Sequence, residues 1–315
     1  MLLKNQELKK FLIATAIVVV SVCIIDKAVG ILGNHSMRLI PDFSGHLAKD
    51  NFTMNRLTDV DVLIVGSSRA SHHYDAQLLI DSINNYTQSS YSIYNAGIDG
   101  NFLNHNACRL ESILDRYQPK LVIFEIGESE LSESGGGIQS SISQMAPYYQ
   151  LSKQAAAYLN RVDWKTRIQL QSAMYRFNNK PLRILSSFLI PSVANNGYDP
   201  LYGELTHHTV HENTTSAIAL STYSLQSLTQ VFDKCKALGV ILLITSSPRY
   251  QASDNNNRLA RICHEADIPY IELYNEEIFN AHSEYFKDAA HLNDTGAKVF
   301  TAMMFERLKP FITQF

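Results

Sequence analysis

The sequence has little net charge, few cysteines and no paired cysteine motif, and each absence argues against a class of protein. The formal net charge is −3, and aromatic residues are not interleaved with lysine or arginine, so no strong positive field is available for nucleic acid. The four cysteines include no CxxC pair, which argues against a zinc or redox motif. We expect Cys108, Cys235 and Cys263 to be small core residues, whereas Cys23 lies in an apolar N-terminal run.

That apolar run is the most informative feature of the N-terminus. Three lysines precede Phe11–Ile25, and after a charged interruption at Asp26 the apolar character resumes up to Leu32. A membrane-spanning helix needs about 20 apolar residues, so residues 1–32 are predicted to form an uncleaved signal anchor. The basic flank predicts a cytoplasmic N-terminus and an exported remainder. A cleaved signal peptide, giving a secreted form, is the alternative.

The rest of the chain is predicted to be a stalk followed by one α/β domain. Residues 33–58 are mixed and polar, and we interpret them as the stalk. Residues 59–315 contain short apolar runs that alternate with amphipathic segments. The expected strands are Val60–Val65, Tyr91–Tyr94, Leu121–Ile126, Val240–Thr245 and Pro269–Leu273. The expected helices are Tyr74–Ile83, Asn101–Tyr117, Ala217–Ala237, Asn255–Ala266 and Asn293–Leu308, the last capped by Asn293 or Asp294.

This alternation predicts a flavodoxin-like, doubly wound, parallel five-stranded sheet with helices on both faces. Residues 135–215 interrupt the pattern as an insertion, helical over Tyr149–Phe177 and irregular from Pro181 onward. In doubly wound sheets the functional site lies beyond the carboxyl ends of the strands. The segments that follow the expected strands are therefore the ones to search for chemistry.

Small polar segments follow each of the first three expected strands. The first is Gly66-Ser67-Ser68, in which a serine hydroxyl at a tight strand-to-helix turn is well placed as a nucleophile. The second contains Gly97, and the third is Gly127-Glu128-Ser129-Glu130. Ser246-Ser247-Pro248-Arg249 follows the fourth strand, so Arg249 faces the same crevice and is a candidate for binding an anionic substrate group.

The segment Asp288-Ala289-Ala290-His291 follows the fifth expected strand and supplies the missing base. A serine hydroxyl is a poor nucleophile until a base takes its proton, and histidine has a suitable pKa for that role. A separation of three residues lets the Asp288 carboxylate reach the His291 ring across one turn. We predict a catalytic triad of Ser68, His291 and Asp288.

The order of these segments resembles the SGNH/GDSL hydrolase superfamily over about residues 60–310. Gly66-Ser67-Ser68-Arg69 resembles block I, with Ser68 as nucleophile and oxyanion donor, and Asp288-x-x-His291 resembles block V. The resemblance makes Gly97 a block II oxyanion donor and puts Ser129 at the position of the block III asparagine. The sequence departs from the family pattern at Ser67, Arg69 and Ser129, where aspartate, leucine and asparagine are usual. Arg69 is a further candidate for substrate binding.

The resemblance implies a serine esterase or O-acyltransferase that acts on acyl esters, acetyl above all, of cell-surface carbohydrate. It implies no metal or organic cofactor. The membrane anchor is similar to that of the branch that modifies polysaccharides at the bacterial cell envelope, where a membrane-bound acyl-exporting protein is an expected partner. A non-catalytic binding or assembly subunit of a polysaccharide export system is the alternative. His207, His208 and His211 lie in the irregular insertion, and we interpret them as solvated loop residues rather than metal ligands.

Overall fold

A single parallel sheet organises the molecule. The computed structural model describes residues 2–41, 45–132, 138–189, 196–206, 219–251 and 257–313. The strands are β1 (Val62–Val65), β2 (Ile93–Asn95), β3 (Leu121–Glu125), β4 (Ile241–Ser246) and β5 (Tyr270–Glu272). They pair in the order β2-β1-β3-β4-β5, all parallel. This is the flavodoxin-like order, so the predicted fold class is confirmed.

The strands read as continuous apolar runs because both faces of the sheet are covered. All four residues of β1 are buried. Leu63 and Val65 belong to one hydrophobic cluster, whereas Val62 and Ile64 belong to another on the opposite face. The core therefore has two halves, separated by the sheet.

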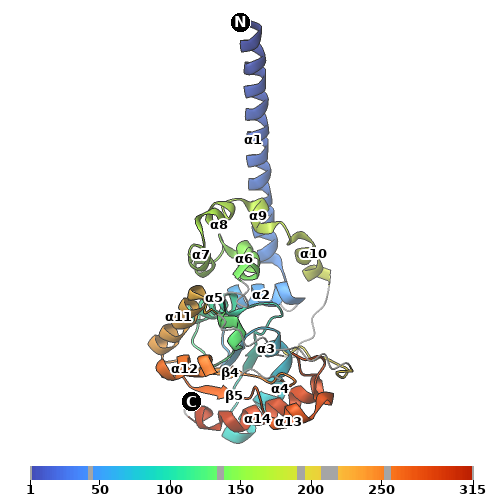
Figure 1. Ribbon diagram of the computed structural model, residues 1–315, viewed down its shortest axis with the longest axis vertical. Helices are drawn as coiled ribbons and strands as arrows, with labels where there is room; N and C mark the ends of the chain where they lie inside the picture. Colours follow the sequence, from blue (N-terminus) through green and yellow to red (C-terminus); the bar gives the residue numbers. More distant parts are fainter. Residues whose placement is uncertain are drawn as a thin grey trace.

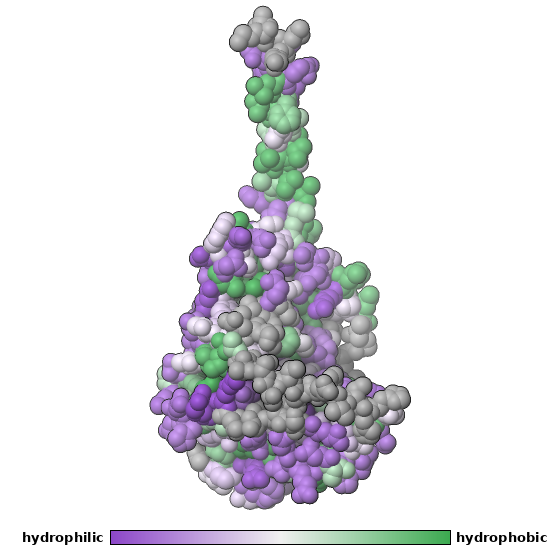
Figure 2. All heavy atoms as spheres, in the orientation of Figure 1, coloured by the Kyte–Doolittle hydropathy of each residue, from purple (hydrophilic) through white to green (hydrophobic). Residues whose placement is uncertain are grey.

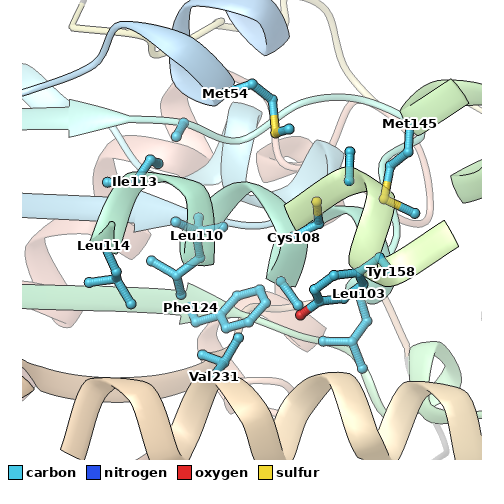
Figure 3. Close-up of a cluster of buried hydrophobic side chains, with 14 of the residues drawn as sticks. Met54, Leu103, Cys108, Leu110, Ile113, Leu114, Phe124, Met145, Tyr158 and Val231 are labelled. Carbon is cyan, nitrogen blue, oxygen red and sulfur yellow. The ribbon is translucent and has the colours of Figure 1, made fainter. Parts of the chain in front are cut away.

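Helices cover the two faces in separate groups. One group is α2 (Gly45–Asn55), α5 (Leu103–Leu114), α11 (Thr222–Leu238) and α12 (Asn257–Glu265). The other is α3 (Ser68–His73), α4 (Ala76–Thr87), α13 (Glu277–Ala281) and α14 (Asp294–Ile312). Figure 3 shows the first half of the core, where Leu110 of α5 and Val231 of α11 enclose Phe124 of β3. The buried, unpaired Cys108, Cys235 and Cys263 confirm the expectation for these thiols.

Local capping fixes where the helices begin. The Asp75 side chain accepts a hydrogen bond from Leu78 N at the start of α4. The Ser221 side chain does the same for α11. Asn293, one of the two predicted caps, accepts from Gly296 N at 3.0 Å and begins α14. This cap places the start of α14 three residues after His291.

The N-terminal helix is longer than predicted, and the expected stalk is part of the folded domain. α1 spans Leu2–Leu39, and it projects from one end of the molecule (Figure 1). Met37 and Ile40 are fully buried, and Met54 of α2 is almost fully buried. Within the expected stalk, residues 33–39 and 45–55 are therefore helical, and the apolar side chains of Met37, Ala48 and Met54 pack into the core.

One helix among the described residues, Asn5–Leu39, is long and apolar enough to cross a membrane. Its side chains over Phe11–Ile25 are exposed and form the apolar stem in Figure 2. Asp26, which ends that run, accepts hydrogen bonds from Ser172 Oγ at 2.6 Å and Met174 N at 2.8 Å. These bonds join α1 to the beginning of α9 (Ala173–Phe177), so the helix meets the domain at a defined point.

The insertion is more regular than predicted. After the short 3₁₀ turn η1 (Glu128–Leu131), it contains α6 (Ile138–Met145), η2 (Ala146–Tyr148), α7 (Lys153–Leu159), α8 (Trp164–Gln169), α9 and α10 (Pro181–Leu189). α10 corrects the expectation of irregular structure from Pro181, since proline is tolerated in the first turn of a helix. These helices lie on the side of the domain from which α1 emerges (Figure 1). His207, His208 and His211 lie outside the described residues.

A buried arginine connects α2, α5 and the loop after β2. Arg109 is fully buried, and its guanidinium forms an ion pair with Asp50 Oδ1 at 3.1 Å and donates a hydrogen bond to Thr53 Oγ1 at 2.9 Å. It also donates to the Ala96 carbonyl at 2.5 Å. Removing one partner of a buried ion pair leaves an uncompensated charge and unpaired acceptors.

We therefore expect Arg109→Met to destabilise the protein by about 3–5 kcal/mol. Arg167→Met, which removes an exposed guanidinium from α8, is the matched control and should change stability by less than about 0.5 kcal/mol. Urea unfolding of the two variants measures the difference. Equal stability of the two variants would contradict the structural role given to Arg109.

Candidate active site

Ser68 lies at the junction of β1 and α3, where a glycine lets the chain turn beside β3. Gly66 has a φ of +157°, and a Cβ there would lie 2.8 Å from the carbonyl oxygen of Glu125. No larger residue fits between the two strands without displacing backbone. The turn ends with Ser68 as the first residue of α3, facing the carboxyl edge of the sheet.

The segment that carries His291 is a tight reversal near the other end of the chain. It follows the 3₁₀ turn η3 (Ser283–Tyr285), and Phe286 and Leu292 form an isolated antiparallel bridge across it. Lys287 N donates to the His291 carbonyl at 2.9 Å. Phe286 and Leu292 are fully buried and anchor both ends of the reversal in the core. The residues between them, including Asp288 and His291, are thereby held at the surface of the sheet edge.

The structure brings the three predicted triad residues together. His291 Nε2 lies 2.7 Å from Ser68 Oγ, although the two residues are 223 positions apart in the sequence. His291 Nδ1 lies 2.9 Å and 3.0 Å from the two carboxylate oxygens of Asp288. With Asp288 ionised, Nδ1 carries the proton and Nε2 is free to accept the serine proton. A base and its nucleophile are in hydrogen-bonding distance, and the base is oriented by a carboxylate.

Asp288 is held in its ionised form by the same reversal. Partial burial raises its pKa, but hydrogen bonds from His291 and from Ala290 N at 2.8 Å outweigh that effect and hold the pKa below its usual range. The carboxylate is about half exposed. Its charge is therefore partly screened by solvent, and its main contribution is to fix the ring orientation and tautomer of His291.

Ser68 and His291 open into a cleft of about 270 Å³, which we call the catalytic cleft. Its wall is built from the ends of β1 and β3 and from the segments after β4 and β5. The lining residues include the predicted Ser129, Arg69 and Arg249. The structure thus assembles groups from both halves of the chain at one edge of the sheet, as the topology requires.

Gly97 occupies a different place from the one predicted for an oxyanion donor. Its N–H donates to Asn95 Oδ1 at 2.9 Å, and the residue is buried beneath α3 rather than lining the cleft. A Cβ at Gly97 would lie 2.3 Å from Ser71 N, so glycine here permits close packing of the loop against α3. Ser68 and Ser129, the other two residues predicted to donate to an oxyanion, both line the cleft.

Sequence reasoning missed a buried histidine next to the triad. His73 is the last residue of α3, and it is fully buried. Its Nε2 accepts from Leu292 N at 3.0 Å, so Nδ1 carries the proton and donates to Ser247 Oγ at 2.9 Å. Burial lowers the pKa of His73 well below its usual range, and nearby His291 lowers it further, so the ring stays neutral. His73 therefore positions the backbone directly after His291. The only sequence signal for this role is that His73 lies in the helix that begins with Ser68.

Arg69 lines the cleft, and its guanidinium is also held beneath the cleft by a buried carboxylate. Its side chain is nearly buried and forms an ion pair with Glu125 at 3.2 Å. Glu125 also accepts from Ser247 Oγ at 3.1 Å, which links Arg69 to the residue that His73 holds. Arg249 is half-buried and donates to the Tyr274 hydroxyl at 3.4 Å. Of the two predicted substrate-binding arginines, Arg69 is thus mainly committed to Glu125.

Among the residues that the structure describes, no group of three or more histidine, cysteine or carboxylate side chains is arranged to hold a metal ion. His72 Nε2 lies 3.0 Å from Asp99 Oδ2. Its ring meets that of His291 edge-on, with centroids 5.7 Å apart. His72, like His73, is buried.

No family model matches the sequence, and no curated protein matches it. Several solved structures are similar in fold. An acetyl xylan esterase shares 13% identity over 78% of this chain and 98% of its own, with a TM-score of 0.41. An esterase from Pseudoalteromonas shares 14% identity over 81% and 100% of the two chains, with a TM-score of 0.43. A two-domain esterase active on acetylated mannans shares 14% identity over 86% and 55%, with a TM-score of 0.41. At these scores the function has to be argued from the site itself.

One residue of the site gives a prediction about pH. Burial raises the pKa of Glu130 to about 7, and the neighbouring Glu125 adds to the rise. The folded protein keeps this proton over a range in which the unfolded chain releases it, so stability falls as pH rises through that range. Relative to Glu130→Gln, the wild-type protein should lose up to about 3 kcal/mol between about pH 4.5 and 7.

Urea unfolding at several pH values measures this difference, and Glu265→Gln, on the exposed side of α12, is the control. The control should run parallel to the wild type across the range. A difference between wild type and Glu130→Gln that stays constant with pH would contradict the raised pKa.

Proposed function

We propose that this chain is a serine esterase of the SGNH/GDSL type, with Ser68 as nucleophile, His291 as general base and Asp288 as the residue that orients it. The observation that carries the proposal is the 2.7 Å contact between His291 Nε2 and Ser68 Oγ, with Asp288 bound to the other ring nitrogen. This arrangement lies in an open cleft at the carboxyl edge of a doubly wound sheet.

The reaction follows from the positions of the protons. His291 Nε2 takes the hydroxyl proton of Ser68 as Oγ attacks the ester carbonyl carbon, and the carbonyl oxygen becomes an oxyanion. The resulting imidazolium is stabilised by Asp288 and then gives its proton to the leaving alcohol. Water, or a second hydroxyl, attacks the acyl-Ser68 ester with His291 again as base. The acyl group is released and Ser68 regains its proton.

The oxyanion in this proposal is bound by the Ser68 N–H and the Ser129 hydroxyl. Both residues line the catalytic cleft, whereas the Gly97 N–H is used by Asn95. Losing one oxyanion donor typically costs about 10²–10³ in rate.

The acyl group proposed is acetyl, and the alcohol is a carbohydrate hydroxyl. The cleft supports a polar substrate because serine, arginine and glutamate side chains form most of its wall. Hydrolysis and transfer to a second sugar share every step up to the acyl-enzyme. Formation of an acetylated acceptor oligosaccharide, weighed against release of free acetate, separates an O-acyltransferase working with a membrane-bound acyl-exporting protein from an esterase.

We further propose that α1 anchors the catalytic domain to a membrane on its extracytoplasmic side. The exposed apolar residues of α1 support this proposal. Exposed apolar side chains on the part of the domain nearest to α1 support it as well. Trp164 and Ile168 of α8 and Leu182 and Leu189 of α10 are between 60% and 81% exposed. These helices lie where α1 leaves the domain (Figure 1), so their apolar side chains would reach the lipid interface.

One observation favours a second candidate function, a non-catalytic assembly or binding subunit. The Gly97 N–H is occupied by Asn95, and Ser129 is the only side chain that we assign as an oxyanion donor. In this reading the fold and cleft bind carbohydrate without turning it over.

A fluorophosphonate probe separates the two candidates. The probe reacts with a serine only when a base activates it, so the wild-type protein should be labelled at Ser68, whereas Ser68→Ala should not. Intact-protein mass spectrometry measures the adduct and peptide mapping locates it. Ser129→Ala keeps the nucleophile and its base but loses the proposed side-chain oxyanion donor, so it should still be labelled at Ser68, more slowly than the wild type. Absence of labelling in the wild type would favour the non-catalytic subunit.

A further inference from the structure

A second cavity of about 540 Å³ adjoins the catalytic cleft. Phe102 lines both, so one side chain forms part of each wall. The second cavity is bounded by the loop Ile98–Phe102 after β2, by the start of α2 and by α10. Its volume falls within the range of ligand pockets, roughly 300–1,000 Å³. The proposed reaction uses no residue that lines only this cavity.

An unpaired ammonium group lies in its wall. Lys180, directly before α10, is 2% exposed and lines the cavity. Within the described part of the chain, its Nζ forms no hydrogen bond and no ion pair within 4.0 Å, and the Asp50 carboxylate attracts it from farther away. A charged group is rarely buried without a partner, because the loss of hydration is costly. Burial and nearby Arg183 lower the pKa of Lys180 to about 8, so at neutral pH it is still mostly protonated.

The other charged groups of the cavity leave a positive excess. Asp50 is bound by Arg109 at 3.1 Å and by His105 at 3.3 Å, so its charge is already compensated. Asp99 is likewise bound by His72. Arg183, an exposed residue of α10, lines the cavity beside Lys180. The two cations therefore face a cavity whose carboxylates are otherwise engaged.

We propose that the second cavity binds an anionic group, a carboxylate or a phosphate, on the carbohydrate whose ester lies in the catalytic cleft. Lys180 and Arg183 bind the anion, and the shared wall at Phe102 lets one chain of sugars occupy both spaces. This inference rests on the proposed esterase function and gives it a substrate class, acidic acylated carbohydrate. The anion would supply the hydrogen-bonded, oppositely charged partner that the Lys180 ammonium lacks in the free protein.

The test compares kcat/KM for three acetylated oligosaccharides: a neutral mannan, an acidic oligogalacturonide and a phosphorylated mannan. The wild type should prefer one of the two anionic substrates to the neutral one by about 10- to 100-fold, the worth of a hydrogen bond to a charged group. Whichever of the two anionic substrates is preferred identifies the bound group as a carboxylate or a phosphate. Lys180→Met should abolish most of this preference, and Arg183→Gln should reduce it.

Lys236→Met is the matched control, because Lys236 is an exposed lysine at the end of α11, on the opposite edge of the sheet. It should keep the wild-type preference. Lys180→Met should also raise Tm, because it removes a buried charge that has no partner, whereas Lys236→Met should not. A fall in Tm with Lys180→Met would mean that Lys180 is a structural ion-pair partner, and would overturn the proposal.

The remaining outcomes are distinct. Equal kcat/KM for the three substrates in the wild type overturns the anionic subsite and leaves the esterase intact. If no acetyl ester is turned over and the phosphonate probe does not react, the esterase itself is wrong. Arg183→Gln alters an exposed side chain, so it still decides the question if Lys180→Met fails to fold: an unchanged preference in Arg183→Gln would then overturn the proposal.

Discussion

The parallel sheet brings the carboxyl ends of its strands to one edge, and the catalytic cleft depends on that constraint. Ser68 leaves this edge after β1, Ser129 after β3 and Arg249 after β4, while His291 comes from the reversal that follows β5. The contact between His291 and Ser68 exists because the sheet order places these segments near one another, although a large part of the sequence separates them.

Beneath the triad, a buried polar network holds both halves of the contact. His73 binds the backbone of Leu292, Ser247 binds His73 and Glu125, and Glu125 binds Arg69 next to Ser68. A buried network of this kind resists movement, because each bond that breaks leaves a buried polar group without a partner. The relative position of nucleophile and base is thus fixed by residues that do not take part in the proposed chemistry.

The sequence was sufficient to predict the elements whose signals are local. Continuous apolar runs such as Val62–Val65 marked the strands, and Asn293 marked the start of α14. The prediction of a stalk over residues 33–58 was wrong. The apolar residues there are too widely spaced to reveal a buried helix face, and the core contacts of Met37 and Met54 appear only in the folded structure. The Gly97 N–H bonds the Asn95 side chain two residues earlier, a local contact that the resemblance to the hydrolase superfamily did not indicate. The burial of His73 depends on tertiary packing that no local pattern carries.

The central claim is that Ser68 and His291 act as one catalytic unit, and a double-mutant cycle tests it most directly. The measurement is kcat/KM for acetyl ester hydrolysis by Ser68→Ala, His291→Ala and the double variant. Residues that work as a unit are strongly non-additive, so the double variant should be no less active than either single variant. Losses that multiply, or a single variant that retains full activity, would contradict the account.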